Sequence, residues 1–321
     1  LPVCACHQRD DPHGDNQFLN PGLIQHFIME IKEIMKMRYK SLLLVVPAIL
    51  SLASCTKLSE PYYEIKGVSV DTNKRAVLLE DYTGHLCVNC ASAGKMANSL
   101  QELYHGQVFV MAVHAGPFAK PSNAHPPYLE ANYSCPEAEE WYNFSGFNIL
   151  GNPSGMVNRT PWNGKISFLP SQWTGALQYA ITQPKLAIMT VHNTCDEVNN
   201  TLTTNIATKF LANYTGKITL TVCLLEDNIY GGQLNNDPKT DSVPIIKNYR
   251  FMHMLRENLN GTFGENLATD PSKDAIFKKT YQLCFDGKPW VRSNCSVLAF
   301  ISDTESKEVL HVAKAPLNTG N

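Results

Sequence analysis

The sequence lacks three features that would point to particular partners or folds. Its formal net charge is only −2 and no long basic run lies outside the N-terminal region, so a nucleic-acid partner is not expected. The apolar run at 42–50 with its flanks holds roughly a dozen apolar residues, too few for a comfortable bilayer span. Only one Cys-x-x-Cys pair occurs, whereas zinc sites usually need four ligands at recognised spacings. The sequence therefore argues against nucleic-acid binding, a membrane-spanning helix and a zinc site.

The composition is that of an ordinary globular protein. The chain has 321 residues, of which 44% are hydrophobic and 17% are charged. A chain of this length and composition can build a hydrophobic core and is long enough for about two domains.

An export signal lies near the N-terminus. Met37-Arg38-Tyr39-Lys40 is positively charged, residues 41–50 are apolar, and Leu52-Ala53-Ser54-Cys55 resembles a bacterial lipobox. We expect a lipoprotein signal peptide at 37–54, acylation of Cys55 and a polar tether at 55–66. The alternative is an ordinary secretory signal followed by a chance cysteine. Either signal exports the protein to a compartment where disulfides persist.

Residues 1–36 do not fit this signal. They begin with a leucine and precede a complete signal, so we expect them to be an upstream extension outside the native chain. We therefore leave them out of the predicted fold. The alternative is a metal cluster formed by Cys4, Cys6, His7 and His13.

The stretch from Ala76 to Ser99 organises the rest of the chain. The apolar run at 76–79 predicts a buried strand that ends at Thr83-Gly84, and a helical pattern begins after Cys90. A cysteine at a helix N-terminus is favoured as a thiolate by the unpaired backbone N–H groups and the helix dipole. Strand, turn, Cys-x-x-Cys and helix is therefore the layout that a dithiol redox site requires.

The pattern after this stretch predicts two domains. A second strand at 108–114 completes a parallel β-α-β unit, followed by an insertion at 117–150 with a helix near 136–144. A turn at 151–153, a short strand, an Asn-Gly hairpin and a helix at 171–181 end a first domain at 67–183. Residues 184–321 alternate between apolar and polar side chains in several strands, which predicts an antiparallel β-sandwich domain. The segment 230–272 interrupts these strands and is expected to be a long loop, partly helical at 249–258.

The order of elements in the first domain resembles the thioredoxin fold. The motif Cys87-Val88-Asn89-Cys90 matches the redox motif of that fold, and Asn152-Pro153-Ser154 matches the segment that carries its cis-proline. The resemblance implies a buried carboxylate six residues before the first cysteine, where this chain has Asp81. The expected fold class is thus an α/β thioredoxin-like domain, with an insertion before the cis-proline, followed by an all-β antiparallel sandwich. Ala91 departs from the pattern, because a proline commonly follows the second cysteine.

A narrower resemblance is carried by four motifs of this chain. They are similar to the twenty-eight-kilodalton outer-membrane lipoprotein family of Bacteroidetes. The resemblance implies an outer-membrane protein that is lipid-anchored and faces the periplasm or the cell surface. The four motifs are the stretch from Leu79 to Cys90, Val113-His114-Ala115-Gly116, Gly155-Met156-Val157-Asn158-Arg159 and the lipobox.

Thiol–disulfide exchange is the leading chemical hypothesis. Cys87 would be the nucleophilic thiolate and Cys90 the resolving thiol that releases a mixed disulfide. Protonated His85 would lower the pKa of Cys87, Asp81 would move the proton of Cys90, and cis-Pro153 would hold backbone beside the disulfide for pairing with a substrate strand. The first alternative is a permanent structural disulfide on a scaffold used for binding. The second is a metal site formed by His85, Cys87, Cys90 and His114.

The predicted function is a membrane-anchored, extracytoplasmic thiol–disulfide oxidoreductase that acts on exported proteins. Its partners would be exported protein disulfides or a redox partner, with the membrane bound through the lipid on Cys55. No cofactor and no resident metal are expected. The alternative function is a surface adhesin or receptor-type binding lipoprotein with a structural disulfide. The pairing of the other mature cysteines stays open: Cys135, Cys195, Cys223, Cys284 and Cys295.

Overall fold

The structure is a computed structural model that describes residues 74–104, 106–237 and 243–317. Several predicted features lie outside these residues. They are the extension at 1–36, the signal peptide at 37–54, Cys55 with its tether, and an edge strand expected at 67–70.

The predicted β-α-β unit is present. Strand β1 (Val77–Thr83) and strand β2 (Val108–His114) pair in parallel, with Val77 opposite Val108, and helix α2 (Cys90–Leu103) connects them. Every residue of β1 is buried, as expected for a strand covered on both faces. Strand β3 (Ser154–Val157) pairs antiparallel with the other edge of β1, and β4 (Ser167–Phe168) pairs with β3.

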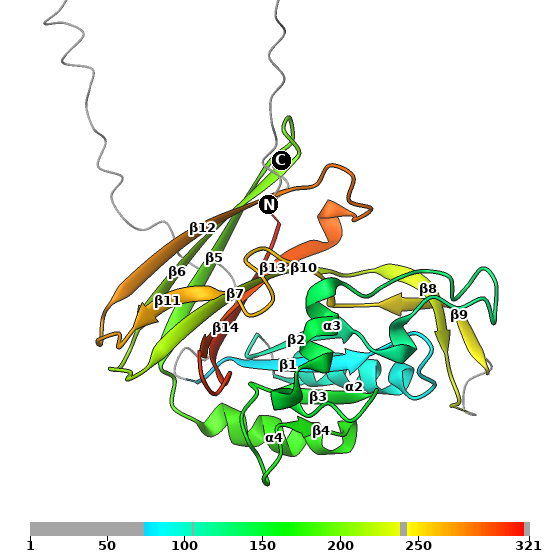
Figure 1. Cartoon of the computed structure of the whole chain (residues 1–321), viewed down its shortest axis with the longest axis horizontal. Coiled ribbons are helices and arrows are strands. Elements are labelled where there is room, and N and C mark those ends of the chain that lie inside the picture. Colours follow the sequence, from blue (N-terminus) through cyan, green and yellow to red (C-terminus); the bar gives the residue numbers. More distant parts are fainter. Residues whose placement is uncertain (1–73, 105, 238–242, 318–321) are drawn as a thin grey trace, which may run out of the picture. The chain divides into compact units, whose positions relative to one another are not determined.

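The predicted fold class is wrong. The described chain is mainly β-structure, and β1 to β4 do not form the sheet of a separate α/β thioredoxin-like domain. They continue into one nine-stranded sheet with the order β14-β13-β7-β10-β2-β1-β3-β4, in which β11 also pairs with β7 (Figure 1). The added strands are β7 (Lys217–Glu226), β10 (Met254–Asn258), β11 (Glu265–Thr269), β13 (Cys295–Asp303) and β14 (Val309–Pro316).

The error has a physical reason. A local β-α-β pattern predicts that β1 and β2 pair, but it carries no information on which distant strand takes the free edge of β2. That edge is taken by β10, where Met254 lies opposite Ala112. Hydrogen-bonded strands from both sides of the predicted boundary at 183/184 therefore share the main sheet.

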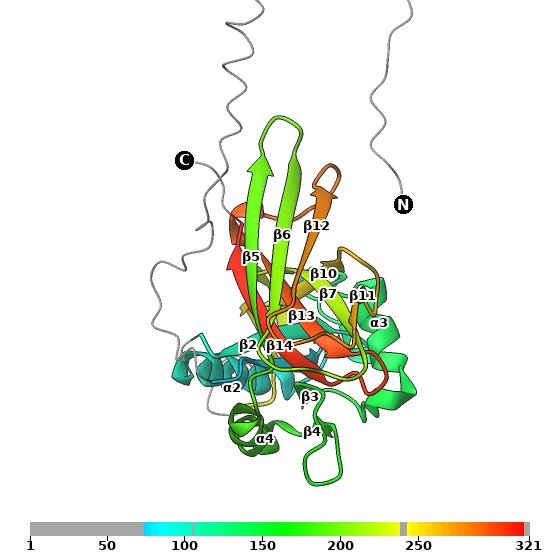
Figure 2. The same cartoon turned by 90° about the vertical axis from the view of Figure 1, so that its left-hand side faces the viewer.

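A second sheet faces the β14-β13-β7-β11 part of the main sheet (Figures 1 and 2). Its strands are β5 (Ala187–Asp196), β6 (Thr201–Phe210) and β12 (Ile276–Cys284), in the order β12-β6-β5. In β6 every second side chain from Leu202 to Phe210 is buried, so the alternation read from the sequence marks the inner face correctly. These inner side chains pack with those of β7 and β13 in one hydrophobic cluster.

The segment expected to be a long, partly helical loop is mostly β-structure. It contains β8 (Ile229–Leu234), β9 (Ile245–Phe251), β10 and β11, and β8 pairs with β9 in a separate hairpin. The predicted helix at 249–258 is therefore wrong. Its apolar residues Tyr249, Phe251 and Met254 are buried or half-buried because tertiary partners cover a strand, which overrides the weak helical spacing.

Helices cover the two faces of the sheet near β1. Helices α2 and α4 (Pro170–Thr182) pack on one face through buried residues such as Ala97 and Trp173. Helix α3 (Pro136–Asn143) packs on the other face, where Trp141 is fully buried among residues of β1, β7 and β13. Within the described residues there are also three short 3-10 turns: Pro117–Ala119, Ser145–Phe147 and Arg292–Asn294.

A buried ion pair joins β1 to the residues after β3. Arg159 donates two hydrogen bonds to the carboxylate of Glu80, at 2.8 Å from Nε and 2.7 Å from Nη2. The guanidinium lies over the rings of Trp141 and Phe147, at 5.1 and 4.6 Å from their centroids. Because both charges are almost completely removed from water, the bidentate geometry and the aromatic contacts are needed to offset desolvation.

Candidate functional site: a covered disulfide

The Cys-x-x-Cys motif forms a disulfide at the start of α2. Cys87 and Cys90 are bonded, with their Cα atoms 5.4 Å apart. The preceding turn passes so close to residue 118 that a Cβ on Gly84 would lie 2.4 Å from the Phe118 carbonyl oxygen, so only glycine fits there. The sequence predicted this strand–turn–helix arrangement.

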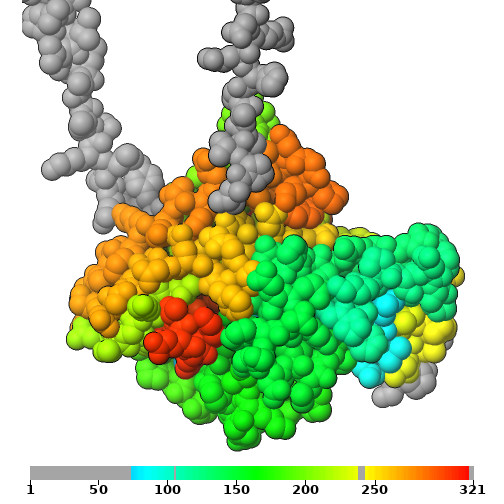
Figure 3. Space-filling model, in the orientation of Figure 1, coloured from blue at the N-terminus to red at the C-terminus, as the bar shows by residue number. Residues whose placement is uncertain are grey.

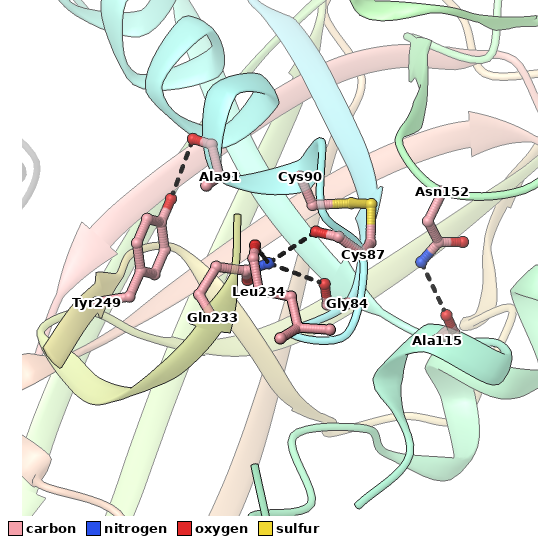
Figure 4. Close-up of a disulfide and its surroundings, with 9 residues drawn as sticks. All are labelled: Gly84, Cys87, Cys90, Ala91, Ala115, Asn152, Gln233, Leu234 and Tyr249. Atoms are coloured by element: carbon pink, nitrogen blue, oxygen red, sulfur yellow. Dashed lines mark hydrogen bonds between the residues drawn. A yellow bond between two sulfur atoms is a disulfide. The ribbon is translucent and has the colours of Figure 1, made fainter. Parts of the chain in front are cut away.

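Both sulfur-bearing residues are buried, with Cys87 only 3% and Cys90 only 2% exposed. Strand β8 and the residues after it form hydrogen bonds with the backbone of the disulfide loop. The side-chain amide of Gln233 donates a 2.8 Å hydrogen bond to the Cys87 carbonyl oxygen, and the backbone N–H of Leu234 donates to the His85 carbonyl oxygen at 2.8 Å. Figure 4 shows Gln233, Leu234 and Tyr249 beside the disulfide loop.

Strand β8 packs closely against the 117–135 stretch because β8 has glycines, Gly231 and Gly232, at the contact. A Cβ on Gly231 would lie 2.0 Å from the Tyr133 hydroxyl oxygen, and one on Gly232 would lie 2.5 Å from the Tyr128 carbonyl oxygen. The β8–β9 hairpin and the 117–135 stretch therefore lie in direct contact, as the space-filling view shows (Figure 3).

Asp81 lies in β1 and is buried behind the disulfide. It lines a small cavity of about 30 Å³ together with Cys90, His114 and Tyr249, which is room for roughly one water molecule. Burial raises the pKa of Asp81 to about 7, and Oδ1 has no hydrogen-bond partner in the described protein. The same burial lowers the pKa of His114 to about 3, so that imidazole is neutral. The structure thus brings Asp81 and Cys90 together.

The His85 side chain contacts residues of the 117–135 stretch. Its Nε2 lies 3.3 Å from the Leu129 carbonyl oxygen, and its ring packs edge-on against Tyr133 with 5.3 Å between centroids. Burial lowers the pKa of His85. A neutral imidazole supplies no positive charge that would stabilise a Cys87 thiolate.

Pro153 follows a cis peptide bond, as the resemblance to the thioredoxin motif implies. The next residue, Ser154, lies opposite Tyr82 in the β1–β3 pair, so Pro153 lies next to the turn that leads to Cys87. The Asn152 side-chain amide donates a 3.0 Å hydrogen bond to the Ala115 carbonyl oxygen and holds this segment in place (Figure 4).

Sequence reasoning missed the residues that cover the disulfide. Gln233 and Tyr249 lie more than 140 residues after Cys87, in the segment predicted to be a loop. The available signals were the Gly231-Gly232 pair, typical of close backbone approach, and the β-branched and aromatic residues of 245–251. Neither signal says which surface the hairpin contacts.

The remaining cysteines and the metal alternative can be placed as well. Within the described residues, no group of three or more His, Cys, Asp or Glu side chains is arranged to hold a metal ion. Five cysteines in the same ranges form no disulfide with one another: Cys135, Cys195, Cys223, Cys284 and Cys295.

Comparison with known proteins places the chain in a family. The family model described as outer membrane protein Omp28 matches residues 141–321, which is more than half of the chain. The chain belongs to the Omp28 family. The match covers β3 to β14 with α4 and leaves out β1, β2 and the Cys87–Cys90 disulfide. The predicted family is thus confirmed, whereas the thioredoxin-like fold is not.

Two solved structures are similar to this chain. A domain of the outer membrane lipoprotein Omp28 from Porphyromonas gingivalis is 22% identical, with a TM-score of 0.26, covering 41% of this chain and 88% of that chain. A structural-genomics protein from Agrobacterium tumefaciens is 12% identical, with a TM-score of 0.48, covering 76% of this chain and 96% of that chain. No curated protein matches the sequence.

Membership of the Omp28 family confirms the predicted outer-membrane localisation. In the part of the chain that the structure describes, no helix has the length and apolar character needed to cross a bilayer. Acylation of Cys55 lies outside that part and stays a prediction. The predicted function is confirmed only at the level of an outer-membrane protein of this family.

Proposed function

We propose that this Omp28-family protein is a binding lipoprotein of adhesin or receptor type in which the Cys87–Cys90 disulfide is structural. One observation carries the proposal: both cysteines are almost completely buried, in a loop whose backbone is hydrogen-bonded to β8. Thiol–disulfide exchange requires a thiolate to approach a sulfur atom directly, so its rate depends on access to that sulfur. A disulfide covered by hydrogen-bonded backbone stabilises a turn and does not exchange readily.

The contacts of the cover support a structural role. Gln233 replaces solvent at the Cys87 and Gly84 carbonyl oxygens, and the backbone N–H of Asn236 donates to the Val88 carbonyl oxygen at 3.3 Å. Opening the site would break these bonds together, and each buried group left unpaired costs roughly 1–3 kcal/mol.

A comparison of native and unfolded protein tests the proposal. The native protein is treated with dithiothreitol, alkylated and analysed by mass spectrometry, and a urea-unfolded sample is treated in the same way. We expect the native disulfide to be reduced far more slowly than the unfolded one, and we expect no insulin-disulfide reduction by the native protein. Reduction at equal rates, or insulin reduction that is lost in Cys87→Ser, would refute the structural role.

Thiol–disulfide exchange remains the second candidate function. The observation that favours it is Asp81, whose pKa of about 7 lies in the range of a proton acceptor and which shares a cavity with Cys90. This function would require the β8–β9 hairpin to move before exchange. It predicts that Gln233→Ala raises insulin reduction strongly and that Cys87→Ser abolishes the activity in the same background.

A further inference from the structure

The main sheet opens along the free edge of β2. Strand β10 pairs with β2 at one register position only, Met254 opposite Ala112, and the backbone N–H of Ala112 donates to the His253 carbonyl oxygen at 2.8 Å. Nearer the start of β2, the N–H of Val110 donates to the Gln101 side-chain oxygen at 2.9 Å, so a helix side chain takes the place of a strand.

A cavity of about 500 Å³ lies at this opening. We refer to it as the seam cavity. It is lined by the end of α2, the start of β2, residues 227–228 after β7, residues 293–296 and the end of β14. Most of its lining side chains are polar, and this volume is ample for a small ligand.

Hydrogen-bond roles at the floor of the seam cavity can be assigned. Because the Gln101 oxygen accepts from Val110, its Nε2 is the donor to His253 Nε2, 3.1 Å away. His253 is therefore protonated on Nδ1, which lies 2.9 Å from Asp227 Oδ1 and donates to it. Burial lowers the pKa of His253, which agrees with a neutral ring.

Lys314 forms an ion pair with Asp227, but within the described residues this assignment gives it no acceptor at short hydrogen-bond distance. Its Nζ lies 3.3 Å from His253 Nδ1, but both atoms are donors, and the Asp227 Oδ2 atom is 3.8 Å away, which is ion-pair distance. The Lys314 side chain is only 16% exposed, so water replaces few of the missing hydrogen bonds. A buried ammonium group that lines a cavity and whose carboxylate partner is this distant has room for a ligand oxygen as a closer acceptor.

A second buried polar side chain lines the seam cavity. Ser296 is 5% exposed, and its Oγ has no hydrogen-bond partner in the described protein. Ser296 pairs with Pro316, and Leu298 pairs with Lys314, so Ser296 and Lys314 lie on the same face of the β13–β14 ladder. The two side chains therefore come from neighbouring strands.

The charges of the seam cavity select the class of ligand. A cation would not supply a closer acceptor for Lys314. An anion would lie beside Asp227, whose charge already balances Lys314. A hydroxyl group satisfies both, since it accepts from the ammonium and donates to the carboxylate. The half-buried ring of Phe109 offers an apolar surface in the same cavity.

We propose that the seam cavity binds a neutral polyhydroxylated ligand of sugar size, held by Lys314 and Asp227. The proposal deepens the binding function proposed above and rests on it. The ligand would place one hydroxyl within hydrogen-bond distance of both Lys314 Nζ and Asp227 Oδ2.

The test uses the full chain and defined probes. Glucose, galactose and N-acetylglucosamine are the neutral probes, glucuronate is the anionic probe and glucosamine the cationic one. Binding is followed by calorimetry and by backbone amide NMR shifts. We expect at least one neutral probe to bind, with shifts at residues 108–110 and 294–296, and to bind more tightly than either charged probe.

Two variants and a control locate the site. Lys314→Met removes the ammonium and should weaken binding by about tenfold or more, as expected for a lost charged hydrogen bond. Ser293→Trp places a large ring at the exposed rim and should abolish binding without disturbing the core. Lys278→Met, on the exposed face of β12, should change nothing.

The remaining outcomes overturn the proposal. Absence of binding by every neutral probe, unchanged binding in both cavity variants, or a preference for glucuronate or glucosamine would each do so. Insulin reduction by the native protein would overturn the structural role of the disulfide and leave a positive sugar result intact, so the two failures are distinguishable.

Discussion

The two ends of helix α2 lie against regions that differ in how their buried polar groups are hydrogen-bonded. At its start, the Cys87–Cys90 loop is covered by β8, and the buried carbonyl oxygens of Gly84 and Cys87 receive a donor from Gln233. At its end, Gln101 reaches the seam cavity, where Lys314 is paired with Asp227 only at 3.8 Å and Ser296 Oγ has no hydrogen-bond partner in the described protein.

The two regions differ in the space beside their unpaired groups. The unpaired Asp81 Oδ1 near the disulfide lines a cavity of about 30 Å³, whereas the seam cavity of about 500 Å³ has room for a ligand. Buried polar groups in a folded protein are normally paired, so unpaired groups beside a cavity are the exception that needs a cause. The Cys-x-x-Cys motif, which is conspicuous in the sequence, lies in the buried region at the start of α2, called here the closed region. The region that is open to a ligand has no recognisable motif.

The largest expected effect concerns the ion pair next to the closed region. Arg159→Met leaves Glu80 buried and uncompensated, so the free energy of unfolding should fall by about 3–5 kcal/mol in urea titrations. The double variant Glu80→Met/Arg159→Met should recover part of this loss. Lys209→Met, which breaks the exposed pair with Asp274, should leave the urea midpoint nearly unchanged. Equal losses in the two single variants would contradict the comparison.

The pH dependence of stability should reveal Asp81. Its pKa is about 7 when folded and near its ordinary 3.8 when unfolded, so between these values only the folded state keeps the proton. The stability contributed by this group is present below pH 3.8 and is lost as the pH rises through about 7, by a few kcal/mol at most. Asp81→Asn should therefore gain stability relative to the wild type from pH 4 to 8.

The difference between the two stability curves isolates Asp81. The pKa of His114 is lowered to about 3, so both proteins lose stability through this group as the pH falls below 6.5, and the effect cancels in the difference. A difference curve that is flat between pH 4 and 8 would show that Asp81 titrates normally.

Gln233→Ala should open the closed region. It removes the donor to the Cys87 carbonyl oxygen and should cost about 1–3 kcal/mol. Reduction of the native disulfide by dithiothreitol should become faster, as alkylation and mass spectrometry would report. Gln282→Ala, on the exposed face of β12, is the matched control and should leave the reduction rate unchanged. A rate equal to the wild type would mean that β8 does not limit access.

The smallest effect on stability is expected in the open region. Lys314→Met removes a buried ammonium whose ion pair with Asp227 is long, at 3.8 Å, so the free energy of unfolding should change by less than about 1 kcal/mol or increase. A loss as large as that of Arg159→Met would show that Lys314 is a structural partner of Asp227, and the comparison between the two regions would fail.

Several elements could be predicted from local patterns. The apolar runs of β1 and β2, the helix at 90–103 and the alternation in β6 depend on neighbours within a few residues. Strands β8 to β10 were missed because their residues are weakly periodic and become strands through distant contacts, such as the close fit of Gly231 to Tyr133.

The candidate site likewise contains residues that the sequence predicts correctly and residues that it does not. Cys87, Cys90 and Asp81 come from one continuous stretch, and the structure brings them together. His85 was assigned a charge that its burial removes, because the sequence does not report how deeply a side chain will be covered. The pairing of Glu80 with Arg159 joins a residue of β1 to one in the turn after β3, and no local spacing predicts it.

The sequence by itself determined the family, the outer-membrane localisation, the disulfide turn and the strands with strong alternation, since each depends on a contiguous stretch of residues. Tertiary structure alone decided that one sheet joins both halves, that β8 holds the disulfide loop and that a buried lysine with only a long ion pair lies beside a cavity. These features depend on contacts between residues far apart in the chain, and their cost or benefit arises from removing polar groups from water. No local pattern records that desolvation.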